Sequence, residues 1–118
     1  MISEEAFARG DVVWHPAPFK SRPKERPFAI LSDTSHPFHG PEYAVVGLTR
    51  TNRPPAVELD EEAWDVGDPG EGSYASPWYV FTIKHANINR PKGALTTAAT
   101  DEVAEAVAAI VGATSSIN

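Results

Sequence analysis

Two apolar runs, residues 27–33 and 42–49, alternate their side chains between two faces at a period of two residues, as β-strands do. In the first run Phe28 and Ile30 share one face, and Ala29 begins an equally apolar second face. A strand that is apolar on both faces lies in the middle of a sheet, where each face is covered. The sequence therefore predicts a sheet in which residues 27–33 form a central strand and residues 42–49 lie beside it.

Proline and glycine interrupt the rest of the chain. Eleven prolines and eight glycines lie between short apolar runs, a distribution that favours strands and turns over long helices. The same patterns predict further strands at residues 11–15, 56–59 and 77–84, a short strand ending at Ile88, one helical turn at 61–64 and a turn at 90–93.

One amphipathic helix is expected near the C-terminus, at about residues 100–112. Thr100 has the character of an N-cap, and two acidic residues follow it, where they favour the positive end of the helix dipole. Gly112 is expected to end the helix. The apolar stripe is formed by Val103, Val107, Ile110 and Val111.

These elements predict a β-rich α+β fold. We expect residues 1–118 to form a single domain of five to seven short strands in a partly closed, mostly antiparallel barrel with one terminal helix. The first nine residues have no apolar core of the kind found in signal peptides, and no run approaches the ~20 apolar residues of a membrane helix. The expected location is therefore cytoplasmic, with no membrane partner.

The charge of the chain is unevenly distributed. The formal net charge is −6, but residues 54–76 carry seven acidic and no basic side chains, which leaves ten basic and nine acidic residues, or +1, elsewhere. The acidic run is either a solvated loop or a patch that repels phosphate or contacts a basic partner. The net charge therefore does not exclude RNA as a substrate.

The most basic loop, residues 20–26, has four cations and one acid and leads directly into the central strand. Its last residue, Arg26, lies at one strand end and Thr49 lies at another, so the two side chains can meet on one rim of the sheet. Alternatively, Arg26 could bridge Glu25 or Asp33, and Thr49 could be an ordinary strand residue.

A resemblance to a known family rests on these residues. The segment Gly-Asp-Val-Val-Trp at 10–14, Arg26-Pro27 before an apolar strand and a strand ending in Thr49 resemble the MazF/PemK family of toxin ribonucleases. The resemblance continues through the strand near 78–84, the turn at 92–95 and the C-terminal helix. It implies an SH3-like barrel, a homodimer, a cognate antitoxin and cleavage of single-stranded RNA as the toxin of a toxin-antitoxin module.

The resemblance also suggests site residues. It places Arg26 and Thr49 at the positions of the arginine and threonine of the family's active site, and Ser21 at a serine of its first loop. We expect substrate binding by Lys20, Ser21, Arg22, Lys24, Thr82 and Lys84.

The chain departs from the family pattern in the same regions. The usual Ser-Glu-Gln loop reads Ser21-Arg22-Pro23 and one loop residue is deleted, while Thr82 stands where a glutamine is usual. These departures concern the choice of RNA sequence more than the pairing of a cation with a hydroxyl.

RNA cleavage without metal requires a base, an acid and a cation where charge develops on the phosphorane. Arg26 suits the last role, because guanidinium stays charged and its forked donors match phosphate oxygens. Other side chains remain open between functional and structural roles: His15 and His85 as acid or base, and Trp14, Trp78 and Tyr79 as base-stacking platforms or as core and dimer packing.

No metal or other cofactor is expected. The chain lacks cysteine, and His36 and His39 have no third ligand patterned beside them, which indicates a solvated turn. Two other functions remain possible: a catalytically inactive barrel that binds RNA or a partner protein, and a toxin of the same fold that acts on a protein target such as a topoisomerase. Cleavage of synthetic RNA distinguishes the enzyme from a binding protein.

Overall fold

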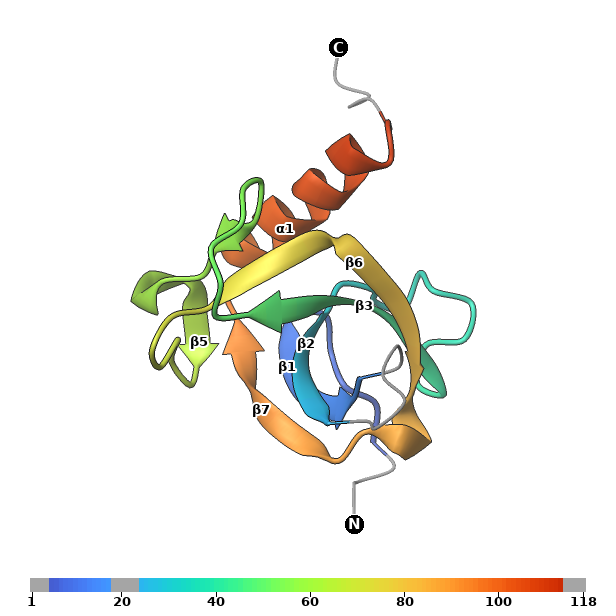
Figure 1. The fold of residues 1–118 in the computed structure, drawn as a ribbon. Helices are drawn as coiled ribbons and strands as arrows, with labels where there is room; N and C mark the ends of the chain where they lie inside the picture. The colour runs from blue at the N-terminus through green and yellow to red at the C-terminus, as the bar shows by residue number, and fades with distance from the viewer. Residues whose placement is uncertain (1–4, 18–23, 114–118) are drawn as a thin grey trace.

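An antiparallel sheet of seven strands forms most of the computed structural model, which describes residues 5–17 and 24–113. The strands are β1 (Asp11–Pro16), β2 (Glu25–Ile30), β3 (Glu42–Thr49), β4 (Val57–Glu58), β5 (Trp64–Val66), β6 (Tyr74–Lys84) and β7 (Arg90–Leu95), in the order β4-β6-β3-β2-β1-β7-β5. Short 3-10 turns span Glu61–Ala63 and His85–Asn87, and helix α1 spans Thr97–Ile110. The sheet curls around on itself and α1 packs against β6 and β4 (Figure 1). The predicted small barrel with one terminal helix is confirmed.

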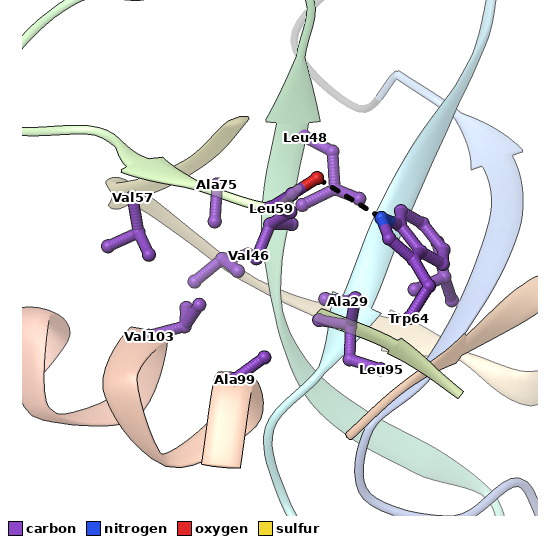
Figure 2. Packing of buried hydrophobic residues seen from close by; sticks show 11 residues of the cluster. Ala29, Val46, Leu48, Val57, Leu59, Trp64, Ala75, Leu95, Ala99 and Val103 are labelled. Carbon is purple, nitrogen blue, oxygen red and sulfur yellow. Dashed lines mark hydrogen bonds between the residues drawn. The ribbon is translucent and has the colours of Figure 1, made fainter. Parts of the chain in front are cut away.

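Two apolar clusters cover the two faces of the sheet. Ala29 belongs to the cluster under α1, whereas Phe28 and Ile30 belong to the other cluster, which confirms that this strand is apolar on both faces. Figure 2 shows the first cluster, in which Ala99 and Val103 of α1 point toward the sheet. Its remaining buried members are Val12, Val46, Leu48, Val57, Leu59, Trp64, Ala75 and Leu95, and those of the second are Val13, Tyr43, Val45, Ile83 and Ile88.

The predicted start of the helix is wrong. The helix begins at Thr97, and its N-cap is Thr96, whose hydroxyl oxygen accepts a hydrogen bond from the Ala99 backbone N–H at 3.1 Å. Thr100 lies inside the helix, buried, and its hydroxyl donates to the Thr96 carbonyl at 2.8 Å. The sequence has a threonine at both positions, and the intervening alanines are strong helix formers that extend the helix toward the N-terminus.

The turn predicted at residues 90–93 is also wrong, because these residues belong to β7. Val13 pairs with Pro91 and Val12 pairs with Gly93, so the ladder skips Lys92 at an irregularity. Proline is tolerated at such a position because the ladder bond it cannot donate is already interrupted there. Other boundaries differ: β2 spans 25–30 rather than 27–33, β6 begins at Tyr74 rather than Pro77, and β5 was not predicted.

Within the described part of the chain, no helix has both the length and the apolar character needed to cross a membrane.

Candidate functional site

Arg26 and Thr49 lie at the ends of adjacent strands. Strands β2 and β3 are antiparallel, and their ladder ends where Phe28 pairs with Gly47. Arg26 and Thr49 each lie two residues beyond this pair, at the same end of the ladder. Both residues line the same two pockets. The structure therefore brings the cation and the hydroxyl to one rim of the sheet, where the two pockets join.

The first of these, which we call the aromatic pocket, has a volume of about 280 Å³. It lies on the face of the sheet to which Phe28 belongs, and four aromatic side chains are among its lining residues. Besides Arg26 and Thr49, its lining residues are Phe28, Gly47, Leu48, Thr51, Arg53, Ser76, Trp78, Tyr79 and Phe81.

The second, which we call the basic pocket, has a volume of about 560 Å³. Its cations are Lys24, Arg26, Arg50 and Lys92. Its two carboxylates are each bound by an arginine: Glu25 by Arg90, and Glu71 by Arg50 at 3.3 Å. The remaining lining residues are Trp14, Pro27, Leu48, Thr49, Thr51, Pro69, Gly70, Gly72 and Ser73. Pairing of both carboxylates leaves the pocket with a positive charge.

Arg26 has an exposed side chain that makes no ion pair with any residue in the described ranges. The two carboxylates nearest to it in sequence have other partners. Glu25 accepts hydrogen bonds from Arg90 and Asn89, which lower the pKa of its carboxyl. Asp33 accepts the backbone N–H of Ser35 at 2.8 Å, which lowers its pKa. The alternative in which Arg26 bridges Glu25 or Asp33 is therefore not what the structure shows.

The fold of this chain is similar to that of several solved structures. No family model and no curated protein matches the chain. Solved structures do match: an endoribonuclease in complex with its cognate antitoxin from a mycobacterial species superposes with a TM-score of 0.68 at 22% identity, over 93% of this chain and 97% of that chain. The Mycobacterium tuberculosis toxin MazF-mt6 gives 0.63 at 23% identity, over 87% and 99%. A chain of the MazE-MazF complex from Deinococcus radiodurans gives 0.72 at 13% identity, over 93% and 100%. This chain has the MazF fold.

The other residues that were predicted to bind RNA do not all lie at the pockets of this MazF-like fold. Lys24 lines the basic pocket, whereas Lys20, Ser21 and Arg22 lie outside the described residues. Thr82 and Lys84 are exposed on β6, where they pair with Ala44 and Glu42, and they line neither pocket. They lie at the opposite end of β6 from Tyr74, which pairs with Thr49.

The two histidines considered as acid or base lie in different parts of the sheet. His15 pairs with Arg26 in the β1–β2 ladder, but it is buried, its ring is edge-on to Phe28, and its Nδ1 lies 2.6 Å from the Pro16 carbonyl oxygen. His85 Nδ1 lies 2.7 Å from the Tyr43 hydroxyl, and burial raises the pKa of Tyr43. Neither histidine lines a pocket. His36 and His39 have no third metal ligand beside them among the described residues.

Sequence analysis missed several residues that line the pockets of this MazF-like chain. Arg53 lies over the Trp78 ring, with its guanidinium carbon 5.3 Å from the ring centroid. Lys92 Nζ lies 5.8 Å from the centroid of Trp14 and 5.0 Å from that of Trp64. Such cation–π contacts join segments far apart in the sequence, so the local pattern carries no signal for them.

Proposed function

We propose that this protein is a toxin endoribonuclease that cuts single-stranded RNA at a short preferred sequence without a metal ion. The products are a 2′,3′-cyclic phosphate and a 5′-hydroxyl. The observation that carries the proposal is the position of Arg26, which is exposed and lines, together with Thr49, both of the two pockets. The MazF fold supports it, because neighbours of that fold are named endoribonucleases.

The chemistry follows from donors directed at one phosphate. The 2′-hydroxyl loses its proton as its oxygen attacks phosphorus, the bond to the 5′-oxygen breaks, and the 5′-oxygen takes up a proton, so that one proton is released and one is consumed. Arg26 offers two forked N–H donors to the non-bridging oxygens, where negative charge grows. The Thr49 hydroxyl oxygen accepts the Thr51 backbone N–H at 3.2 Å, which leaves the hydroxyl proton for a phosphoryl oxygen.

The basic pocket holds the neighbouring part of the RNA backbone. Lys24 and Lys92 line it, and Lys20 and Arg22 belong to the same basic loop in the sequence. Lysines act as point charges on phosphates and make binding depend on salt. Replacing Lys20, Arg22 and Lys24 together should weaken RNA binding and make its salt dependence shallower.

Partners and location complete the proposal. A cognate antitoxin protein is expected because neighbours of the same fold were solved with one. We expect the toxin to be a homodimer in the cytoplasm and to use no cofactor.

A second function has one observation in its favour. The carboxylates that line the pockets, Glu25 and Glu71, are each bound by an arginine, and no histidine lines either pocket. Among the described residues that line the pockets, no carboxylate or histidine is therefore a ready proton acceptor. A catalytically inactive barrel that binds RNA would have this arrangement.

Digestion of a long RNA in EDTA, with the ends of the products mapped, tests the proposal. We expect Arg26→Ala to slow cleavage by roughly 10²-fold or more, as the loss of an oxyanion donor does. Arg26→Lys, the matched control, keeps the charge and loses the fork, so it should recover only part of the rate. Thr49→Val should cost less than Arg26→Ala. Equal cleavage by wild type and Arg26→Ala, or loss of wild-type activity in EDTA, would contradict the mechanism, and binding without cleavage would favour the second function.

A further inference from the structure

The aromatic pocket owes its shape to an irregularity in β6. Val46 of β3 pairs with Val80, but the next residue, Gly47, pairs with Ser76. Three residues of β6, 77–79, therefore have no partner in the β3 ladder and bulge from the sheet. The bulge places Tyr79 beside Gly47, and both Trp78 and Tyr79 line the pocket together with Arg26 and Thr49.

Rings surround an open space in this pocket. The ring centroids of Trp78 and Tyr79 are 6.2 Å apart, and those of Tyr79 and Phe81 are 6.0 Å apart. Gly47 forms the floor, since a Cβ there would lie 3.7 Å from the Phe28 ring and 3.8 Å from Tyr79. Tyr79 remains 45% exposed despite its size. A flat aromatic group entering beside Arg26 would stack on a surface that is already formed.

We propose that the aromatic pocket binds one nucleobase, that of a nucleotide next to the phosphate held by Arg26. The base stacks on the rings of Tyr79 and Trp78. The proposal rests on the proposed function and makes the site asymmetric: the base on one side of the cut is enclosed, and the backbone on the other side crosses the basic pocket. Tyr79 and Trp78 are then the residues that contact the base beside the cut.

Binding of RNA octamers that carry 2′-O-methyl groups at every position, and so cannot be cleaved, tests this pocket. Fluorescence anisotropy is measured for oligo-U, oligo-C and oligo-A with wild type, Tyr79→Ala and Tyr79→Phe. Tyr79→Ala should weaken binding on the order of tenfold, the usual loss for one stacked base, whereas Tyr79→Phe keeps the ring and should bind as wild type does. Phe38→Ala removes another exposed ring, 61% exposed in the 34–41 loop, and should leave binding unchanged.

A second series places a single abasic site at each position of the octamer. In wild type one position should be sensitive, with a loss similar to that of Tyr79→Ala, and the same abasic site should cost nothing further in Tyr79→Ala. Unchanged binding by a folded Tyr79→Ala, equal penalties at every position in both proteins, or no binding of any octamer would overturn the proposal. If the protein cleaves natural RNA but Tyr79→Ala binds the octamers as wild type does, the proposed ribonuclease activity is supported and the subsite is not. If octamer binding depends on Tyr79 but no RNA is cleaved, the subsite is supported and the ribonuclease activity is not.

Discussion

Arg90 of β7 donates two hydrogen bonds to the carboxylate of Glu25 in β2, across the intervening strand β1. The guanidinium of Arg90 also lies over Trp14 of β1, with its carbon 5.1 Å from the ring centroid. The acid next to Arg26 in the sequence is thus neutralised by a different cation. Arg26 keeps its donors for a substrate, while Glu25 is held ionised and poorly suited to accept a proton.

The Glu25–Arg90 pair predicts a specific pH dependence of stability. Hydrogen bonds from Arg90 and Asn89 lower the Glu25 pKa in the folded state below its ordinary value of 4.5. A lowered folded pKa contributes stability that is present above the unfolded pKa and is lost as pH falls through the folded one. Urea unfolding should therefore show wild type more stable than Glu25→Gln at pH 7, and the difference should shrink below about pH 4.5.

The control is Glu25→Gln made in an Arg90→Gln background, because this background lacks the arginine that binds Glu25. The pH-dependent difference should then disappear. A difference between wild type and Glu25→Gln that stays constant from pH 7 to pH 3 would show that the pair makes no such contribution.

Much of the fold could be predicted from the sequence because its signals are local. The period of two in residues 42–49 matches β3, and the apolar faces of β2 follow from the alternation around Phe28. Gly112 was expected to end the helix, and it lies two residues after Ile110 with φ at +82°. Strand β7 escaped prediction because proline and glycine usually mark turns, and only pairing with β1 accommodates Pro91 within a ladder.

The proximity of Arg26 and Thr49 could be predicted from the sequence, whereas the aromatic residues that line the pocket beside them could not. Arg26 and Thr49 could be placed at one rim because Arg26 lies at the beginning of one apolar strand and Thr49 at the end of the antiparallel strand beside it. The bulge that brings Tyr79 next to Gly47 depends on how β6 pairs with β3, which no short stretch of sequence specifies. The partners of Glu25 are also long-range, since Arg90 is 65 residues away along the chain.

The helix stripe predicts a gradient of stability along α1. Val103 is fully buried against the sheet, Val107 is partly buried, and Val111 is 68% exposed. Val103→Asp buries a charge among apolar side chains and should cost several kcal/mol, of the order seen for unpaired buried charges. Val107→Asp should cost a few kcal/mol, and Val111→Asp less than about 0.5 kcal/mol, as at most surface positions. Urea unfolding of the three variants measures this order, and a large loss at Val111 would contradict it.

A homodimer should form through the exposed apolar part of β6. Val80 is 45% exposed on a strand that is apolar along much of its length, and a small barrel has only one interior in which to bury such a face. Gel filtration with light scattering should give about twice the 12.7 kDa chain mass at micromolar concentration. Val80→Asp should yield the monomer, whereas Val66→Asp, at a position 59% exposed on β5, should not. A wild-type monomer, or equal masses for the two variants, would argue against this interface.

Two glycines should respond in opposite ways to alanine. A Cβ on Gly93 would lie 3.3 Å from the Trp64 ring and in hard contact with the Val66 carbonyl oxygen, which belongs to the backbone and cannot rotate away. Gly93→Ala must therefore push β5 from β7, where Val66 pairs with Ala94, at a cost of about 1–3 kcal/mol for overpacking.

A Cβ on Gly47 meets nothing closer than 3.7 Å, so Gly47→Ala should change stability by less than about 1 kcal/mol. It does, however, raise the floor of the aromatic pocket between Phe28 and Tyr79, and it should weaken binding of the 2′-O-methyl octamers. Thermal unfolding and anisotropy on both variants separate the two effects: wild-type stability of Gly93→Ala would mean that β5 yields freely, and unchanged octamer binding by Gly47→Ala would mean that no base reaches the pocket floor.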